Sequence, residues 1–196
     1  MKIIRLLLSA VALVALAACY PPVTTHPVGS TVGFKSDPSL AGLWKARPDA
    51  DNQGSYYYHL LEEKDGTMFA VLVPDNYGHA KDVMMFKFKT ARLGKNFGYL
   101  NVRAMMDPEH ESPDQPPGTV LVLYRLEANG KLQIFMLDED KTKDAIRAHK
   151  IAGTAGKAGT DDAVITADSA TLDKVFRSPA GLALFEKPFA TLTKVK

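Results

Sequence analysis

The sequence predicts a mainly β (α+β) domain, in which an antiparallel meander forms a lipocalin-like barrel or half-barrel with two to three helices near the C-terminus. From about residue 40 onwards, short apolar runs alternate with polar residues and are separated by turn-forming residues. This pattern is typical of consecutive antiparallel strands. After residue 137 the pattern changes to charged, alanine-containing stretches that begin at Asp or Ser, the residues that favour helix N-termini.

Six of the expected strands form three hairpins, whose turns are rich in Gly, Asn, Asp and Lys. We expect residues 55–62 to pair with 67–73, residues 82–90 with 97–104, and residues 119–127 with 131–137. The third turn contains Asn129-Gly130, a favoured hairpin pair because both residues tolerate positive φ. Strands at residues 43–46 and 189–195 complete the expected sheet, and the proline-rich residues 106–118 should form a long surface loop.

The alternation within the second hairpin indicates which side chains face inward. Met84, Phe86 and Phe88 recur at every second position of a strand that also contains lysines. They should therefore line one dry face of the sheet. Residues 55–61 and 120–124 carry apolar or aromatic side chains on both faces, so another layer of structure is expected to cover their second side.

Helices near the C-terminus are the expected covering layer. We expect them at residues 138–150, 168–176 and 178–185. Each begins at a residue whose side-chain oxygen can cap a helix: Asp138, Asp168 (or Ser169) and Ser178. The Gly- and Ala-rich residues 151–159 are expected to form a mobile loop, and residues 163–166 a short strand.

The N-terminus has the features of a bacterial export signal. Lys2 and Arg5 precede an apolar stretch that is too short to span a bilayer comfortably. The stretch ends in Leu16-Ala17-Ala18-Cys19, which resembles the lipobox of bacterial lipoproteins. This resemblance implies that residues 1–18 are a cleaved signal peptide and that Cys19 is lipidated.

The lipoprotein resemblance also implies a location and a membrane partner. The lipid on Cys19 would anchor the mature protein to a bilayer. In this family an Asp after the cysteine favours the inner membrane, so Tyr20 implies the outer membrane, at its periplasmic face, in a Gram-negative source. Residues 19–39 are rich in Pro, Thr, Gly and Ser and are expected to be an extended tether. Residues 40–196 are expected to be one β-rich globular domain.

Composition argues against several functions. Removal of residues 1–18 takes away two basic residues and leaves 22 basic and 22 acidic ones. No excess of positive charge then remains for a nucleic-acid partner. Cys19 is the only cysteine, and its lipidation would leave neither a disulfide nor a thiol nucleophile. The domain must therefore be stabilised by packing alone.

The first expected strand opens with Gly42-Leu43-Trp44. A Gly-x-Trp followed by an antiparallel meander resembles the start of the lipocalins, and bacterial lipocalins are often lipoproteins. The resemblance implies a β-barrel in which Trp44 closes one end. The chain departs from the family pattern in two respects, because a second Thr-Asp-Tyr motif is absent and two helices, not one, are expected before the last strand.

Patterns for catalysis or metal binding are sparse in this sequence. None of the five histidines pairs with another at ligand spacing, and carboxylates near His79 and His110 are the candidates for a metal site. Two Met-Met pairs raise the possibility of copper, but strand alternation sends the two members of each pair to opposite faces. The Gly-x-Ser-x-Gly and phosphate-loop motifs are absent. We therefore expect no cofactor, no metal and no enzymatic activity.

These observations favour a membrane-anchored binding module. Its ligand is expected to be a small apolar molecule or a peptide, held by the inward-facing side chains of Trp44, Met84, Phe86, Phe88, Leu100 and Met136. A second interpretation is a structural, assembly or inhibitory partner in an envelope protein complex, which would use an exposed apolar patch. A third is an envelope enzyme, whose motif is absent from the sequence.

Overall fold

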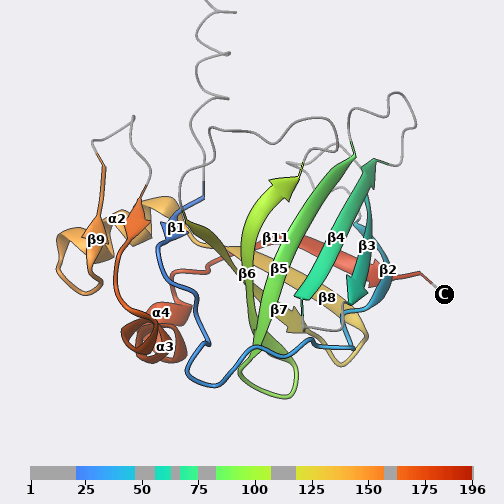
Figure 1. Cartoon of the computed structure of the whole chain (residues 1–196), viewed down its shortest axis with the longest axis horizontal. Helices are drawn as coiled ribbons and strands as arrows, with labels where there is room; N and C mark the ends of the chain where they lie inside the picture. The colour runs from blue at the N-terminus through green and yellow to red at the C-terminus, as the bar shows by residue number, and fades with distance from the viewer. Residues whose placement is uncertain are drawn as a thin grey trace, which may run out of the picture.

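Eight antiparallel strands close into a β-barrel (Figure 1). The computed structural model describes residues 21–46, 56–62, 67–74, 83–106, 118–156 and 163–195. The barrel strands are β2 (Gly42–Ala46), β3 (Tyr56–Glu62), β4 (Thr67–Pro74), β5 (Met84–Arg92), β6 (Phe97–Met106), β7 (Thr119–Leu126), β8 (Lys131–Met136) and β11 (Pro188–Lys194). Neighbouring strands pair in chain order from β2 to β8, and β11 closes the ring between β8 and β2. The expected mainly β fold class is thus confirmed.

Three two-residue strands extend the sheet beside β7. They are β1 (Val23–Thr24), β9 (Gly153–Thr154) and β10 (Val164–Ile165). β1 pairs antiparallel with the start of β7 and parallel with β10, which in turn pairs with β9. The N-terminal end of the described chain is therefore an integral part of the sheet.

The three helices within the described residues begin where the sequence indicates. They are α2 (Glu139–Arg147), α3 (Ser169–Arg177) and α4 (Pro179–Leu182). The side chains of Asp138, Asp168 and Ser178 accept hydrogen bonds from backbone N–H groups in the first turns, at 2.9, 2.8 and 3.1 Å. Each cap satisfies a donor that a helix N-terminus leaves without an internal partner.

The apolar side chains form two separate cores. One fills the barrel interior. The other lies between the helices and the outer side of β6, β7 and β8, and at its centre the rings of Tyr99, Phe176 and Phe185 pack together with centroids 5.8–5.9 Å apart. Helices therefore cover the second side of β7, as expected. In β3, by contrast, the outward side chains of His59 and Leu61 are exposed.

Two segments that were expected to be loose are packed in the structure. The prediction of an extended tether at residues 19–39 is wrong for residues 21–39, which the structure describes. There β1 belongs to the sheet and Val28 is 1 % exposed. The prediction of a mobile loop at residues 151–159 is wrong at its start, because Ile151 is buried and Gly153–Thr154 form β9. The first segment finds its partners far away in the sequence, whereas β9 pairs with β10 about ten residues later.

Candidate binding site

The barrel interior is packed most tightly towards one end, the base. We define the base as the end where β3 joins β4, β5 joins β6 and β7 joins β8. The least accessible interior side chains of the strands, all at most 2 % exposed, are Trp44, Met68, Phe88, Tyr124, Leu132 and Leu192, and Leu40 just before β2 is equally buried. These side chains have almost no accessible surface, so they pack closely against their neighbours.

Trp44 is held by contacts with the segment before β2 and with β11. Its indole Nε1–H donates to the carbonyl of Leu40 at 2.7 Å, and the Lys194 ammonium lies 5.2 Å from the centre of its ring. Gly42, two residues earlier, has φ +126°, and a Cβ there would meet Lys194 Cε at 2.9 Å. The Gly-x-Trp spacing therefore serves a backbone bend and close packing next to the buried indole.

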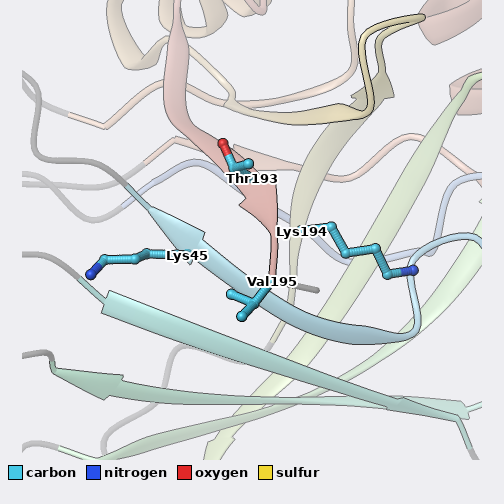
Figure 2. A pocket seen from close by; sticks show the side chains of 4 residues that line it. All are labelled: Lys45, Thr193, Lys194 and Val195. Carbon is cyan, nitrogen blue, oxygen red and sulfur yellow. The ribbon is translucent and has the colours of Figure 1, made fainter.

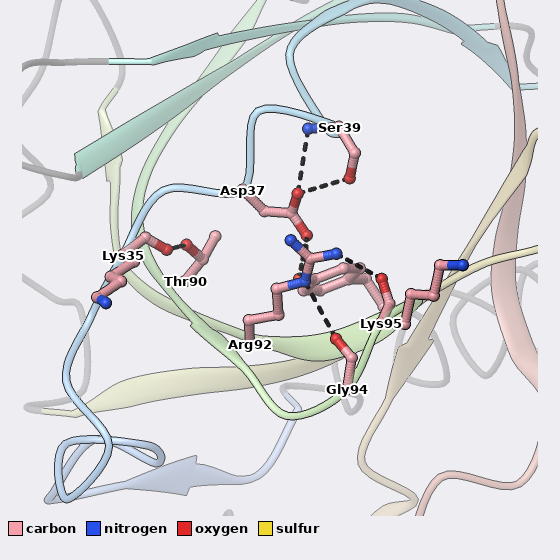
Figure 3. A network of polar contacts seen from close by, with 8 residues as sticks. Lys35, Asp37, Ser39, Thr90, Arg92, Gly94 and Lys95 are labelled. Atoms are coloured by element: carbon pink, nitrogen blue, oxygen red, sulfur yellow. Dashed lines mark hydrogen bonds and ion pairs between the residues drawn. The ribbon is translucent and has the colours of Figure 1, made fainter.

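A buried carboxylate completes the base (Figure 3). Asp37 is 2 % exposed and accepts hydrogen bonds from the Tyr124 hydroxyl at 2.7 Å, and from the Ser39 hydroxyl and N–H at 2.6 and 3.1 Å. The Arg92 Nε lies 3.8 Å from it. Burial acts to raise the pKa of the Asp37 carboxyl, but the hydrogen bonds and the Arg92 charge hold it below its ordinary value.

The opposite end of the barrel interior is more accessible. We call it the open end; it is the end where β4 and β6 finish and β5 and β7 begin. Along β5, Phe88 is 2 % exposed whereas Met84 at the open end is partly exposed. Along β8, Leu132 is fully buried whereas Met136 at the open end is partly exposed. Burial therefore decreases along the barrel axis.

The side chains at the open end share one chemical character. Apart from Leu126 near the base, the partly buried side chains of the interior core are Tyr58, Met84, Phe86, Val102, Val120, Ile134, Met136 and Ala190. None carries a charge, and only Tyr58 has a polar group. Among the described residues, the open end therefore presents an apolar lining with flexible thioethers, which suits an aliphatic ligand.

The six predicted pocket residues all belong to the interior core, but they divide into two groups. Trp44, Phe88 and Leu100 are buried in the packed part of the barrel. Met84, Phe86 and Met136 lie at the open end and are partly exposed. Only the second group is placed to meet a ligand.

The sequence prediction missed other side chains at the open end and the polar network at the base. Ile134 could have been found from strand alternation, because it lies two residues from the predicted inward Met136. Val120 could not, because residues 120–124 are apolar on both faces. Asp37 gave no such signal, because its partner Tyr124 is 87 residues away.

A hollow lies at the paired strands β2 and β11, near the end of β11 (Figure 2). It has a volume of about 330 Å³ and is lined by Lys45, Thr193, Lys194 and Val195. Lys45 Nζ lies 3.1 Å from the Tyr57 hydroxyl, and Lys194 lies over Trp44. These four lining residues offer two ammonium groups and one hydroxyl, and no carboxylate, imidazole or thiol.

Metal-binding and membrane-spanning features are absent from the part of the chain that the structure describes. Within it, no group of three or more His, Cys, Asp or Glu side chains could hold a metal ion. His79 and His110 lie outside the described residues. No helix in the described ranges is long and apolar enough to cross a membrane.

The geometry defines this protein as a closed antiparallel β-barrel with a packed base, a more accessible apolar end and a helical layer on one side. Comparisons with protein-family models, with curated proteins and with solved structures found no match. The function must therefore be argued from the barrel itself.

Proposed function

We propose that this protein is an outer-membrane lipoprotein that binds a small apolar ligand at the open end of its barrel, without catalysing a reaction. The anchor is the lipid on Cys19, as the Leu16-Ala17-Ala18-Cys19 motif implies. The observation that supports ligand binding is the decrease in burial from the base to the open end. A barrel that served only as a structural core would gain stability from equally tight packing at both ends.

The packed base limits which part of a ligand can enter. Trp44, Phe88 and Leu132 are at most 2 % exposed and closely packed, so a ligand would occupy only the part of the interior near the open end. Because the described lining is uncharged, a charged head group would remain outside in water or at the barrel rim. The proposed ligand is thus a chain or tail whose polar group stays at the surface.

A filling variant tests the binding site. We expect Val120→Phe to weaken binding of a fluorescent fatty acid to the soluble Cys19→Ala protein, expressed without residues 1–18, by about tenfold or more. The matched control is Val71→Phe, which adds the same ring on the outer side of β4. Equal affinities of the two variants, or no saturable binding by the unsubstituted protein, would contradict the proposed site.

The anchor has its own test. Metabolic labelling with palmitate should mark the full-length protein and should leave the full-length Cys19→Ala variant unlabelled. The variant should be released as a soluble periplasmic protein or should keep its leader uncut. If Cys19→Ala still matured and fractionated with the outer membrane, a lipid anchor on this residue would be wrong.

A second candidate function is a protein partner in the envelope. The outer face, which we define as the outward side chains of β2 to β5, contains Leu43, Tyr57, His59, Leu61, Phe69, Val71, Val73 and Met85. Leu43 and Leu61 are 38 % and 43 % exposed, and cross-strand pairing places them in adjoining rows with Phe69 and Val71. Lysines interrupt this face, because Lys45 lies over the Tyr57 ring and Lys87 over the Phe69 ring. Exposed apolar side chains that are grouped in this way can form an interaction surface.

Paired variants distinguish this candidate from ligand binding. If the outer face binds a protein, Leu61→Asp should abolish a specific crosslink in intact envelopes, whereas Val120→Phe should leave that crosslink unchanged. If the crosslink survives Leu61→Asp, the outer face is not the contact surface.

A further inference from the structure

The segment before β2 is a strap along the barrel. We use this name for residues 22–41. Val28 is clamped by one side chain, because Asn101 accepts from its N–H at 2.8 Å and donates to its carbonyl at 2.9 Å. Asn101 itself is 3 % exposed. A buried side chain that satisfies both backbone groups of another residue fixes that residue firmly.

Further contacts hold the strap along its length. The carboxylate of Asp173 in α3 accepts hydrogen bonds from the N–H of Gly29 and from the N–H and hydroxyl of Thr31. Lys35 N–H donates to the carbonyl of Thr90 at 3.2 Å. The strap then reaches the base through the Asp37 network (Figure 3). It therefore runs from β1, past α3 and across the base to β2 (Figure 1).

The strap begins beside the open end. Val23 and Val120 are paired residues of β1 and β7, and Val120 is also paired with Val102 of β6. Val102 and Val120 are two of the partly exposed interior residues at the open end. The first strand of the strap thus lies on the wall of the barrel at its accessible end.

Chain length then limits the distance between the anchor and the open end. Cys19 precedes Val23 by four residues, and four residues span at most about 14 Å even when fully extended. A tether of twenty free residues would have allowed any orientation. The packed strap leaves only a short connection, so a lipid on Cys19 holds the open end close to the bilayer.

We propose that the strap holds the open end against the membrane and that the ligand is the acyl chain of a bilayer phospholipid. This inference rests on the proposed lipid anchor and on the proposed apolar site. A chain that passes from the bilayer into a barrel held at the membrane surface keeps its contact with water small. The polar head group can remain at the interface during this transfer, in agreement with the uncharged lining.

The single tryptophan of this chain makes the orientation measurable. Trp44, in the packed part of the barrel, is the native reporter. A reporter at the open end is made by combining Trp44→Phe with Phe86→Trp. If this variant does not fold, the combination of Trp44→Phe with Met136→Trp replaces it. The lipidated, full-length mature protein is reconstituted in phosphatidylethanolamine–phosphatidylglycerol vesicles with brominated acyl chains, which quench tryptophan on contact.

We expect the open-end reporter to be quenched at least twofold more strongly than Trp44. Insertion of twenty Gly and Ser residues between Tyr20 and Pro21 adds a flexible spacer with an end-to-end distance of about 25 Å, and it should remove most of this quenching. Equal quenching of both reporters, or quenching that survives the spacer, would overturn the proposed orientation. If the open-end reporter stays unquenched, for example because the protein's own acyl chain fills the barrel, the proposed ligand is wrong.

Two further measurements separate an error in the orientation and bilayer ligand from an error in the proposed function. Fatty-acid binding by the soluble Cys19→Ala protein measures the apolar site without a membrane, and palmitate labelling measures the anchor. If both succeed while the open-end reporter is not quenched, only the orientation and the bilayer ligand are wrong. If neither succeeds, the proposed function itself is wrong.

Discussion

Asp37 is the residue that joins the strap to the barrel base. Its carboxylate receives three hydrogen bonds from Tyr124 and Ser39 and lies near the Arg92 guanidinium. A buried carboxylate without such partners would be strongly destabilising, whereas one with several donors is held in its charged form. The same contacts raise the pKa of the Tyr124 hydroxyl, because burial and the neighbouring Asp37 charge both disfavour a phenolate.

The pH dependence of stability should reveal this carboxylate. Because the folded-state pKa of Asp37 lies below its ordinary value of 3.8, its ionised form stabilises the fold above that pH. This contribution is lost as the pH falls through the lowered pKa. We expect Asp37→Asn to reduce the free energy of unfolding at pH 7 by about 1–3 kcal/mol, because an amide cannot accept every hydrogen bond that the carboxylate accepts.

Urea titrations between about pH 2.5 and 7 measure the free energy of unfolding of the wild type and of the variant at each pH. The difference between the two proteins should shrink as the pH falls below 3.8, where the protonated carboxyl resembles the amide. Asp140→Asn, at an exposed position of α2, serves as the control. A wild-type–variant difference that is independent of pH would show that the charge of Asp37 does not contribute.

At the scale of elements, strands and helices with local signals were predicted well. The Asn129-Gly130 turn, the alternation of Met84 and Phe86, and the cap at Asp138 are all encoded within a few neighbouring residues, and the structure confirms each. The strap was not predicted, because proline, threonine and glycine also occur in free tethers. What fixes it are Asn101 and Asp173, which lie 73 and 144 residues away from their partners.

The candidate site shows the same division between local and distant information. Alternation correctly placed Met84, Phe86 and Met136 in the barrel interior. It could not tell them from Phe88, because burial along a barrel axis depends on how the other strands close around each position. The open end is therefore a property of the closed sheet and is not visible in a single strand.

Release of the strap should be measurable through its central clamp. Asn101→Ala leaves the N–H and the carbonyl of Val28 without their buried partner, and we expect it to reduce the free energy of unfolding by about 2–3 kcal/mol. Native-state proteolysis should also cut the strap faster in this variant. Asn96→Ala, at an exposed position of the β5–β6 turn, should change neither quantity. Unchanged proteolysis within residues 22–41 of Asn101→Ala would mean that other contacts suffice to hold the strap.

At the scale of the whole molecule, the two cores share three strands. In β7, Leu121 and Leu123 face the helical layer while Val122 and Tyr124 face the barrel interior. The strap adds a second connection, because Asp173 in α3 and Asn101 in β6 both bind it. Loss of the helical layer would expose one whole face of β6 to β8, so the barrel and the helices should unfold together.

A substitution in the helical core should therefore destabilise the barrel as well. Phe176 is fully buried between Tyr99 and Phe185, and Phe176→Ala should reduce the free energy of unfolding by about 3–5 kcal/mol. Trp44 fluorescence reports on the barrel interior, and circular dichroism at the helical band reports on α2 and α3. Both signals should show one coincident urea transition in the wild-type protein, and both midpoints should move together in the variant. If Phe176→Ala moves only the helical signal while the Trp44 transition keeps its midpoint, the helical layer unfolds independently and the strap does not couple it to the barrel.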